Sequence, residues 1–222
     1  MSRNRWILPD GVEEILPDQA WQIENLRRRL LDSYREAGYQ LIMPPLVEFT
    51  DSLFTGVGAD LDLQTFKMVD QISGRTLGLR SDMSPQAARI DAHSMANESV
   101  NRLCYAGSTL RTLPTGPESS RAPIQVGAEI FGDATDSADE EILSLMLDSL
   151  KLAGVEDITL DIGHVGIFAQ LAKQIAEQGE ATDELFDLIQ GKRIPEIKSW
   201  ISSSGISKEL KQLVAALPTL AG

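Results

Sequence analysis

The stretch from Leu110 to Gly132, LRTLPTGPESSRAPIQVGAEIFG, constrains the fold more than any other part of the chain. Its TLPTGP run excludes an uninterrupted helix or strand, because proline and glycine break both. Apolar and polar residues then alternate from Ile124 to Phe131, a pattern typical of a strand with one buried face. The stretch therefore predicts a strand that ends near Arg111, a loop, and an antiparallel returning strand.

Polar side chains gather on one face of this predicted pair. Gln125 and Glu129 project from the same face of the returning strand, because side chains alternate, and pairing would bring Arg111 near them. An arginine can hold a carboxylate, and a carboxylate can accept hydrogen bonds from an ammonium group. The three side chains could therefore bind a small zwitterion. A structural salt-bridge network explains them equally well from spacing alone.

A second polar group is expected where a strand meets a helix. A strand predicted at Thr76–Arg80 leads into a helix expected from Ser84, as its N-cap, to about Met95. Arg80, Asp82 and Ser84 therefore lie close to the free backbone N–H groups of a helix start. Such a place suits an anionic or zwitterionic ligand.

Composition excludes several classes of function. The chain has 33 acidic and 20 basic residues and a net charge of -13, which argues against a protein that binds phosphate backbones. Cys104 is the single cysteine and reads as a buried, inert thiol. His93 and His164 are too few for a histidine-rich metal site, and no nucleotide-binding glycine pattern occurs. We therefore expect no metal, no cofactor, no membrane segment and a cytoplasmic location.

The chain is expected to have an α+β fold with two parts. Residues 1–163 should form an antiparallel sheet flanked by helices, and residues 164–222 a small helical subdomain. Apolar residues repeat at helical spacing in Asp18–Ala37, where Asp18 would be the N-cap, and in Asp136–Ala153. The alternation in Ile158–Ile162 predicts a further strand.

The central stretch resembles motif 2 of class II aminoacyl-tRNA synthetases of the histidyl-tRNA synthetase type. Arg111 and Arg121 match the two arginines that flank the family's loop, and Gln125–Gly132 matches its Gln-x-Gly-x-Glu-x-x-Gly tail. GYQLIMPPLVEF, at Gly38–Phe49, resembles motif 1, which lies at the family's dimer interface. LRSDMSPQAAR, at Leu79–Arg89, resembles the family's Leu-Arg-Pro-Glu-x-Thr segment. The match covers most of residues 5–165 and implies a class II synthetase-like fold.

The resemblance implies a histidine site at five positions, namely Asp82, Ser84, Arg111, Gln125 and Glu129. Arg111 and Gln125 would meet the α-carboxylate. Asp82 and Ser84, together with Gln125, would surround the α-amino group. Glu129 would reach toward the imidazole ring.

The ATP half of the family's site is not matched. Leu113 replaces the family's motif-2 glutamate, and Ser119 stands where an arginine is expected to touch phosphate. The loop also carries Glu118. Adenylyl transfer requires cationic groups or metal at the developing charge, and Arg111 alone is not expected to compensate.

This combination resembles the regulatory subunits of short-form ATP phosphoribosyltransferase, which are histidyl-tRNA synthetase-like. DIGHVGIF, at Asp161–Phe168, is closer to that group than to the synthetases. The resemblance implies a subunit without catalytic activity of its own, which binds free histidine and mediates feedback control of histidine biosynthesis. It also implies assembly with a separate catalytic subunit, a homodimer through Gly38–Phe49, and no tRNA binding.

Two alternatives stay open. The chain could be a fragment of a catalytic histidyl-tRNA synthetase, or a stand-alone amino-acid-binding relative. The family continues beyond Gly222, so we expect a truncated sheet with an unpaired strand edge.

Overall fold

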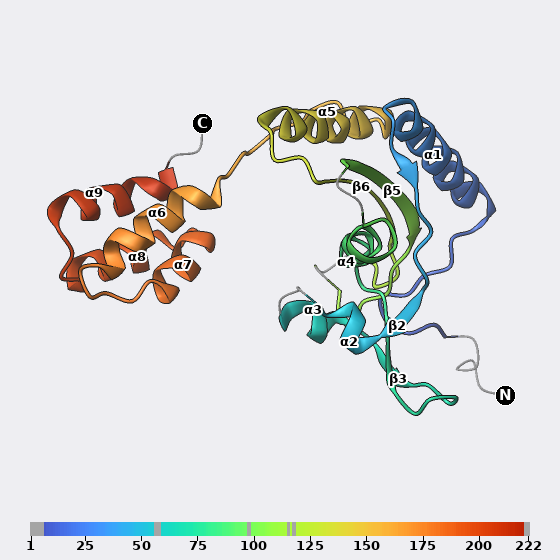
Figure 1. Cartoon of the computed structure of the whole chain (residues 1–222), viewed down its shortest axis with the longest axis horizontal. Helices are drawn as coiled ribbons and strands as arrows, with labels where there is room; N and C mark the ends of the chain where they lie inside the picture. Colours follow the sequence, from blue (N-terminus) through green and yellow to red (C-terminus); the bar gives the residue numbers. More distant parts are fainter. Residues whose placement is uncertain (1–6, 56–58, 97–98, 115, 117–118, 220–222) are drawn as a thin grey trace. The chain divides into compact units, whose positions relative to one another are not determined.

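The computed structural model describes residues 7–55, 59–96, 99–114, 116 and 119–219. The chain divides into two compact units, residues 1–156 and 157–222 (Figure 1). The division lies in the segment that joins helix α5 (Asp136–Leu152) to helix α6 (Val165–Ala176). The boundary expected from the sequence, after residue 163, falls in the same segment.

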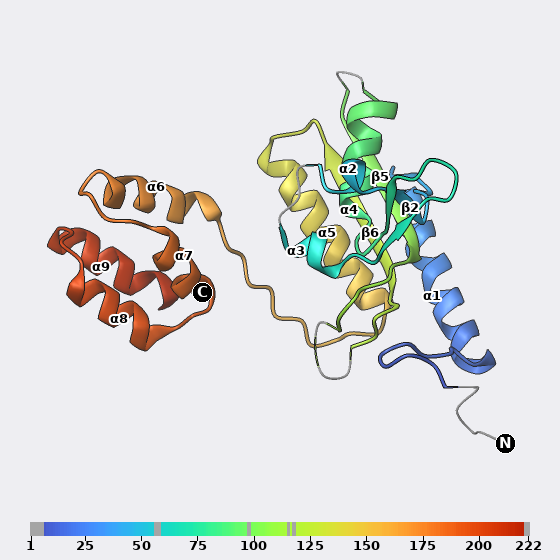
Figure 2. The same cartoon turned by 90° about the horizontal axis from the view of Figure 1, so that it is seen from below.

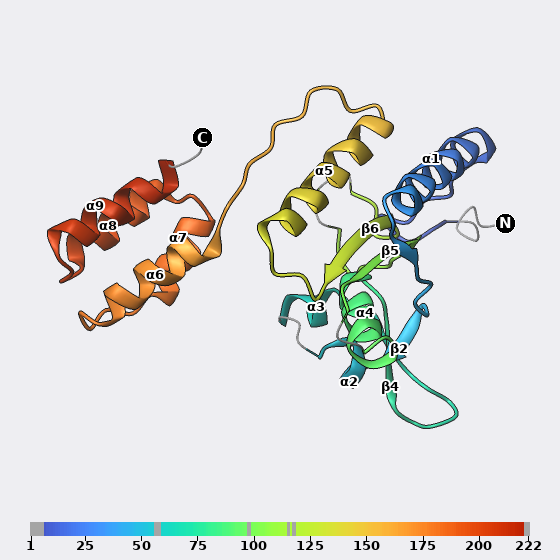
Figure 3. The same cartoon turned by 45° about the horizontal axis from the view of Figure 1, so that its top comes forward.

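The first unit is built on a small mixed sheet. Its strand order is β1 (Gln40–Leu41), β5 (Asn101–Ser108), β6 (Ile124–Phe131), with β1 parallel and β6 antiparallel to β5. Figure 3 shows β5 and β6 side by side. The predicted antiparallel return is thus confirmed. The expectation that the first strand reaches Arg111 is wrong, because β5 ends at Ser108 and the N–H of Leu110 then donates to Arg80 O at 3.0 Å.

Helices α1 (Pro17–Glu36) and α5 cover one face of this sheet (Figure 1). Tyr34, Tyr39, Cys104 and Leu145 form the buried cluster between them, and the apolar side of β6 packs against it. The alternation in β6 is therefore confirmed, as is the burial of Cys104. The predicted cap is wrong. Leu16 precedes the helix and Asp18 lies in its first turn, where its carboxylate favours the exposed N–H groups.

Helix α4 (Ser84–Arg89) packs against the opposite face and continues as a π-helical turn, η2 (Ile90–Ser94). Met83, Ala87 and Tyr105 form the buried cluster there. The predicted extent of this helix is confirmed, but Ser84 is not its N-cap. Its N–H instead donates to Asp82 Oδ1 at 3.1 Å, so the preceding aspartate satisfies a free donor of the helix start.

A second sheet, of order β2 (Val47–Phe49), β4 (Thr76–Leu79), β3 (Lys67–Val69), is antiparallel throughout. Helices α2 (Thr50–Leu53) and α3 (Ala59–Gln64) connect β2 to β3. Proline has no N–H for a ladder, and the prolines at 44 and 45 separate β1 from β2.

The second unit is a bundle of α6, α7 (Asp183–Gln190), α8 (Ile194–Ser203) and α9 (Lys208–Ala216), closed by the 3₁₀ turn η3 (Leu217–Thr219) (Figure 2). It has its own core, made of Leu171, Ile175, Leu185, Leu188, Ile197, Ile206, Leu210 and Val214. The predicted helical character of this part is confirmed.

The predicted strand at Ile158–Ile162 is wrong, because residues 155–164 form neither helix nor strand. A segment with alternating apolar and polar residues forms a strand only where a neighbouring strand supplies hydrogen bonds. In the described part of the chain, no strand pairs with this segment. Its apolar side chains stay accessible, with Ile162 68% exposed.

Two features are absent from the described residues. No helix among them combines the length and apolarity needed to cross a bilayer. No group of three or more histidine, cysteine or acidic side chains among them is placed to hold a metal ion.

We expect Leu185→Ala to destabilise the helical unit by about 2–5 kcal/mol, because Leu185 is fully buried in that unit's own core. Hydrogen–deuterium exchange should rise in α6–α9 and stay unchanged in β5 and β6. Leu213→Ala is the matched control, since Leu213 is 54% exposed. Equal loss of protection in both units would contradict separate cores.

We expect Glu141→Gln to lose stability only above acid pH. Arg102 donates to both carboxylate oxygens of Glu141 at 2.7 Å and holds the pKa of Glu141 below its ordinary 4.5. This stabilisation is present above pH 4.5 and is lost as pH falls through the lowered pKa. Denaturation curves should therefore separate wild type from the variant at pH 7 and converge in acid. Glu140→Gln, at an exposed neighbour on α5, should follow wild type at both pH values.

Candidate functional site

Four of the predicted site residues form one hydrogen-bonded group on the α4 side of the first sheet. Asp82 and Ser84 come from the corner between β4 and α4, and Gln125 and Glu129 come from β6. The β5–β6 register pairs Gly107 with Gln125 and Leu103 with Glu129, so both β6 side chains point to the same face. The group is therefore formed between the β4–α4 corner and strand β6.

Gln125 joins the corner to the strand. Its Oε1 accepts the N–H of Met83 at 3.0 Å, and its Nε2 donates to Asp82 Oδ1 at 2.7 Å. These opposite contacts fix which way the amide points, because only its oxygen accepts and only its nitrogen donates. Asp82 Oδ1 is thereby occupied by Gln125 and by the N–H of Ser84.

Tyr105 completes the group, and the sequence reasoning missed it. Its hydroxyl donates to Glu129 Oε1 at 2.9 Å and lies 3.0 Å from Ser84 Oγ. It stands opposite Gly127 in the register, and a Cβ at that position would lie 2.5 Å from the hydroxyl oxygen. A signal was present in the Gln-x-Gly-x-Glu tail, since a glycine between two polar strand residues makes room for a large neighbour.

The direction of these hydrogen bonds defines what the group can bind. Burial raises the pKa of the Tyr105 hydroxyl, so it keeps its proton. That single proton goes to Glu129, so Ser84 must donate its own to Tyr105. Among the described residues, the acceptors that remain are Asp82 Oδ2, the Ser84 lone pairs and Glu129 Oε2, and the second N–H of Gln125 is left as a donor. The group is therefore suited to a ligand rich in N–H donors.

Arg111 lies at the border of the group. Its Nε is 3.5 Å from Ser81 O, next to Asp82, and its backbone N–H donates to Arg121 O at 2.8 Å. It stands beyond the end of β5, and its Nε contact places it beside the β4–α4 corner.

The loop after Arg111 carries no cation in its described residues before Arg121. Leu113 is 70% exposed. Ser119 Oγ accepts the N–H of Gly116 at 2.7 Å and donates to Gly116 O at 2.8 Å, which closes the loop on itself. The predicted acidic residue Glu118 lies outside the described residues.

Arg121 is engaged by partners outside the hydrogen-bonded polar group. Its Nη1 donates to Asp10 O at 3.0 Å, its Nε to Arg111 O at 3.1 Å, and its guanidinium lies 5.3 Å from the ring centre of Phe66. It therefore anchors the N-terminal segment.

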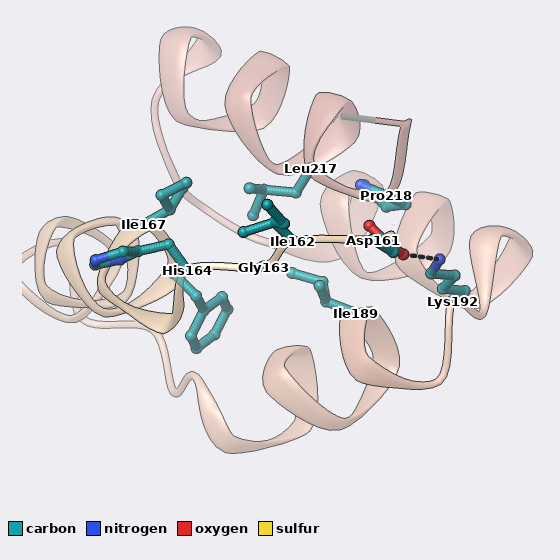
Figure 4. A pocket seen from close by; sticks show the side chains of 10 residues that line it. Asp161, Ile162, Gly163, His164, Ile167, Ile189, Lys192, Leu217 and Pro218 are labelled. Carbon is teal, nitrogen blue, oxygen red and sulfur yellow. Dashed lines mark ion pairs between the residues drawn. The ribbon is translucent and has the colours of Figure 1, made fainter. Parts of the chain in front are cut away.

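A separate hollow of about 280 Å³ lies in the helical unit (Figure 4). Asp161 and Lys192 form an ion pair of 3.8 Å at one side of it. The rest of the lining is mainly apolar, with Ile162, Ile167 and Leu217 among its side chains. None of the sequence-predicted site residues lines it.

The antiparallel strand pair with an amide and a carboxylate on one face, joined to a strand-to-helix corner, is the arrangement that the resemblance to class II aminoacyl-tRNA synthetases predicted. The sequence profile described as histidyl-tRNA synthetase matches residues 11–222. The chain therefore belongs to the histidyl-tRNA synthetase family, and several curated relatives that it matches are named ATP phosphoribosyltransferase regulatory subunits.

Two curated relatives illustrate the match. The Thiobacillus denitrificans protein is 51% identical over 98% of this chain and 67% of its own length. The Saccharophagus degradans protein is 49% identical over 99% of this chain and 56% of its own length. The chain thus spans between about half and two thirds of the length of these relatives.

Solved structures agree on the fold. A Bacillus halodurans structure titled ATP phosphoribosyltransferase regulatory subunit/histidyl-tRNA synthetase matches with a TM-score of 0.84 and 29% identity, over 97% of this chain and 56% of that one. The histidyl-tRNA synthetase of S. aureus matches with a TM-score of 0.53 and 23% identity, over 65% of this chain and 39% of that one. The predicted class II fold is confirmed.

We expect Gly127→Ala to destabilise the first unit by about 1–3 kcal/mol, because the new methyl group would overlap Tyr105 and push it from Glu129. Urea denaturation measures the change. Gly163→Ala is the control, since a Cβ there meets nothing within 4 Å. Equal stability of Gly127→Ala and Gly163→Ala would contradict close packing of Tyr105 against Gly127.

Proposed function

We propose that this chain is the histidine-sensing part of a regulatory subunit that controls a separate ATP phosphoribosyltransferase catalytic subunit and catalyses nothing by itself. The observation that carries the proposal is the group of acceptor atoms around Tyr105, which suits a ligand rich in N–H donors and is accompanied by a loop without described cations. The names of the curated relatives support the same role.

Histidine fits this group by charge and by polarity. Its α-ammonium group would face Asp82 and Ser84, which have acceptor atoms left over. Its imidazole N–H would meet Glu129, whose other oxygen is held by Tyr105. Its carboxylate would lie toward Arg111 and Gln125, the members with N–H donors.

ATP does not fit in the same way. Phosphoryl oxygens require neutralising charge, and the described loop between Arg111 and Arg121 offers no basic side chain. Leu113 is apolar and exposed, and Ser119 is hydrogen-bonded to Gly116. A protein that holds the amino acid but not the nucleotide would sense histidine and leave it unchanged.

A homodimer through Gly38–Phe49 is part of the proposal. This segment contains the edge strand β1 and exposed apolar side chains, with Met43 84%, Leu46 50% and Leu41 49% exposed. Exposed apolar side chains beside an unpaired strand edge favour association with another chain.

Feedback would follow from unequal affinity. Histidine would inhibit the catalytic subunit if it bound one arrangement of the complex more tightly than the other.

A fragment of a catalytic histidyl-tRNA synthetase is the second candidate function, favoured by the family profile. Histidine-dependent pyrophosphate exchange into ATP by the whole protein would select that candidate.

We expect Arg111→Ala in the whole protein to raise the histidine concentration for half-inhibition at least tenfold, because the carboxylate loses its cation. Phosphoribosyl transfer by the reconstituted complex with a short-form catalytic subunit measures the effect. Assembly should be unchanged, and Arg29→Ala, on the exposed side of α1, should behave as wild type. Unchanged inhibition in Arg111→Ala would refute the assignment of the site.

A further inference from the structure

Arg80 is a buried cation with no acidic partner among the residues that the structure describes. Its exposed fraction is 8%, and it takes part in no ion pair within the described part of the chain. Its guanidinium instead donates to two main-chain carbonyls, from Nη1 to Pro44 O at 2.7 Å and from Nε to Ser108 O at 2.8 Å. A buried charge is costly unless hydrogen bonds compensate it, so these contacts define its position closely.

The backbone of Arg80 joins the same two segments. Its N–H donates to Leu46 O at 3.1 Å, and its carbonyl accepts the N–H of Leu110 at 3.0 Å. Gly107 leaves the room for the guanidinium, since a Cβ there would lie 2.5 Å from Arg80 Nη2. Arg80 thus connects the segment around Pro44 to the end of β5.

Two side chains of α4 hold that segment from the other end of the corner. Gln86 Nε2 donates to Pro45 O at 2.8 Å. Arg89 donates to both carboxylate oxygens of Glu48, at 2.6 and 2.9 Å. The corner that carries Asp82 and Ser84 is therefore fastened on both sides, by Arg80 before it and by α4 after it.

We propose that Arg80 is a positioning residue of the candidate site. It fixes the β4–α4 corner against β5, so that Asp82 meets Gln125 at 2.7 Å and presents its remaining oxygen to the ligand. Arg80 itself does not touch the ligand. The inference rests on the proposed histidine binding for its effect on affinity, but its effect on the corner can be measured without ligand.

Lysine cannot replace Arg80 in this role. A lysine has a methylene group where arginine has Nε, so it keeps the charge but loses the hydrogen bond to Ser108 O. Arg80→Lys therefore separates the geometry of the fork from the presence of a positive charge. Arg29→Lys, at an exposed position on α1, is the matched control.

The ligand-free test is amide hydrogen exchange in the whole protein. The N–H groups of Met83 and Ser84 are bonded to Gln125 and Asp82, so they report the closed corner. We expect both to exchange at least tenfold faster in Arg80→Lys, with Leu103 and Tyr105 in β5 unchanged. Faster exchange everywhere would mean general destabilisation, and unchanged exchange at the corner would equally overturn the proposal.

The ligand test compares histidine with imidazole propionate, which lacks the α-amino group. We expect calorimetry to show at least tenfold weaker histidine binding in Arg80→Lys and unchanged binding of imidazole propionate, because only the ammonium meets the corner. Equal losses for both ligands would overturn the proposal. A wild-type protein that binds no histidine would instead refute the proposed function, and the exchange experiment would still decide the role of Arg80.

A second variant covers the case in which Arg80→Lys does not fold. Gly107→Ala keeps Arg80 but places a methyl group against its Nη2. It should speed exchange at Met83 and Ser84 as well. Unchanged exchange at both amides in Gly107→Ala would overturn the proposal.

Discussion

The pairing of β5 with β6 is the interaction on which the rest of the first unit depends. Its register places Tyr105 opposite Gly127 and turns Gln125 and Glu129 toward α4, while the apolar side of β6 packs under α1 and α5. A shift of one residue would exchange the two faces, burying the carboxylate and exposing the core. The same register therefore fixes both the core and the polar group.

Sequence reasoning found the parts whose pattern is local. The alternation in β6 placed Gln125 and Glu129 on one face, and periodicity located α5 and the helical unit. It missed Tyr105, because the middle of β5, Leu103–Gly107, shows no polar alternation and only the partner strand reveals which residue meets the site. It also predicted a strand at Ile158–Ile162, where alternation was present but no described strand pairs with it.

The polar group and the loop beside it have opposite character. Because Tyr105 donates its proton to Glu129 and Ser84 donates its proton to Tyr105, the group around Tyr105 offers mainly acceptor atoms to a ligand. Such atoms suit an ammonium group and an imidazole N–H. The described loop offers no cation for phosphates before Arg121, and Arg121 is engaged with the N-terminal segment. Arg80 ties the segment proposed as a dimer interface to the corner of the site, so the two features share one set of hydrogen bonds.

We propose that this site holds histidine and not ATP. Calorimetric titration of the whole protein with each ligand separately tests it most directly. We expect saturable binding of histidine with one site per chain, and no binding of ATP with or without Mg²⁺. Tight binding of ATP, or the absence of histidine binding, would contradict it.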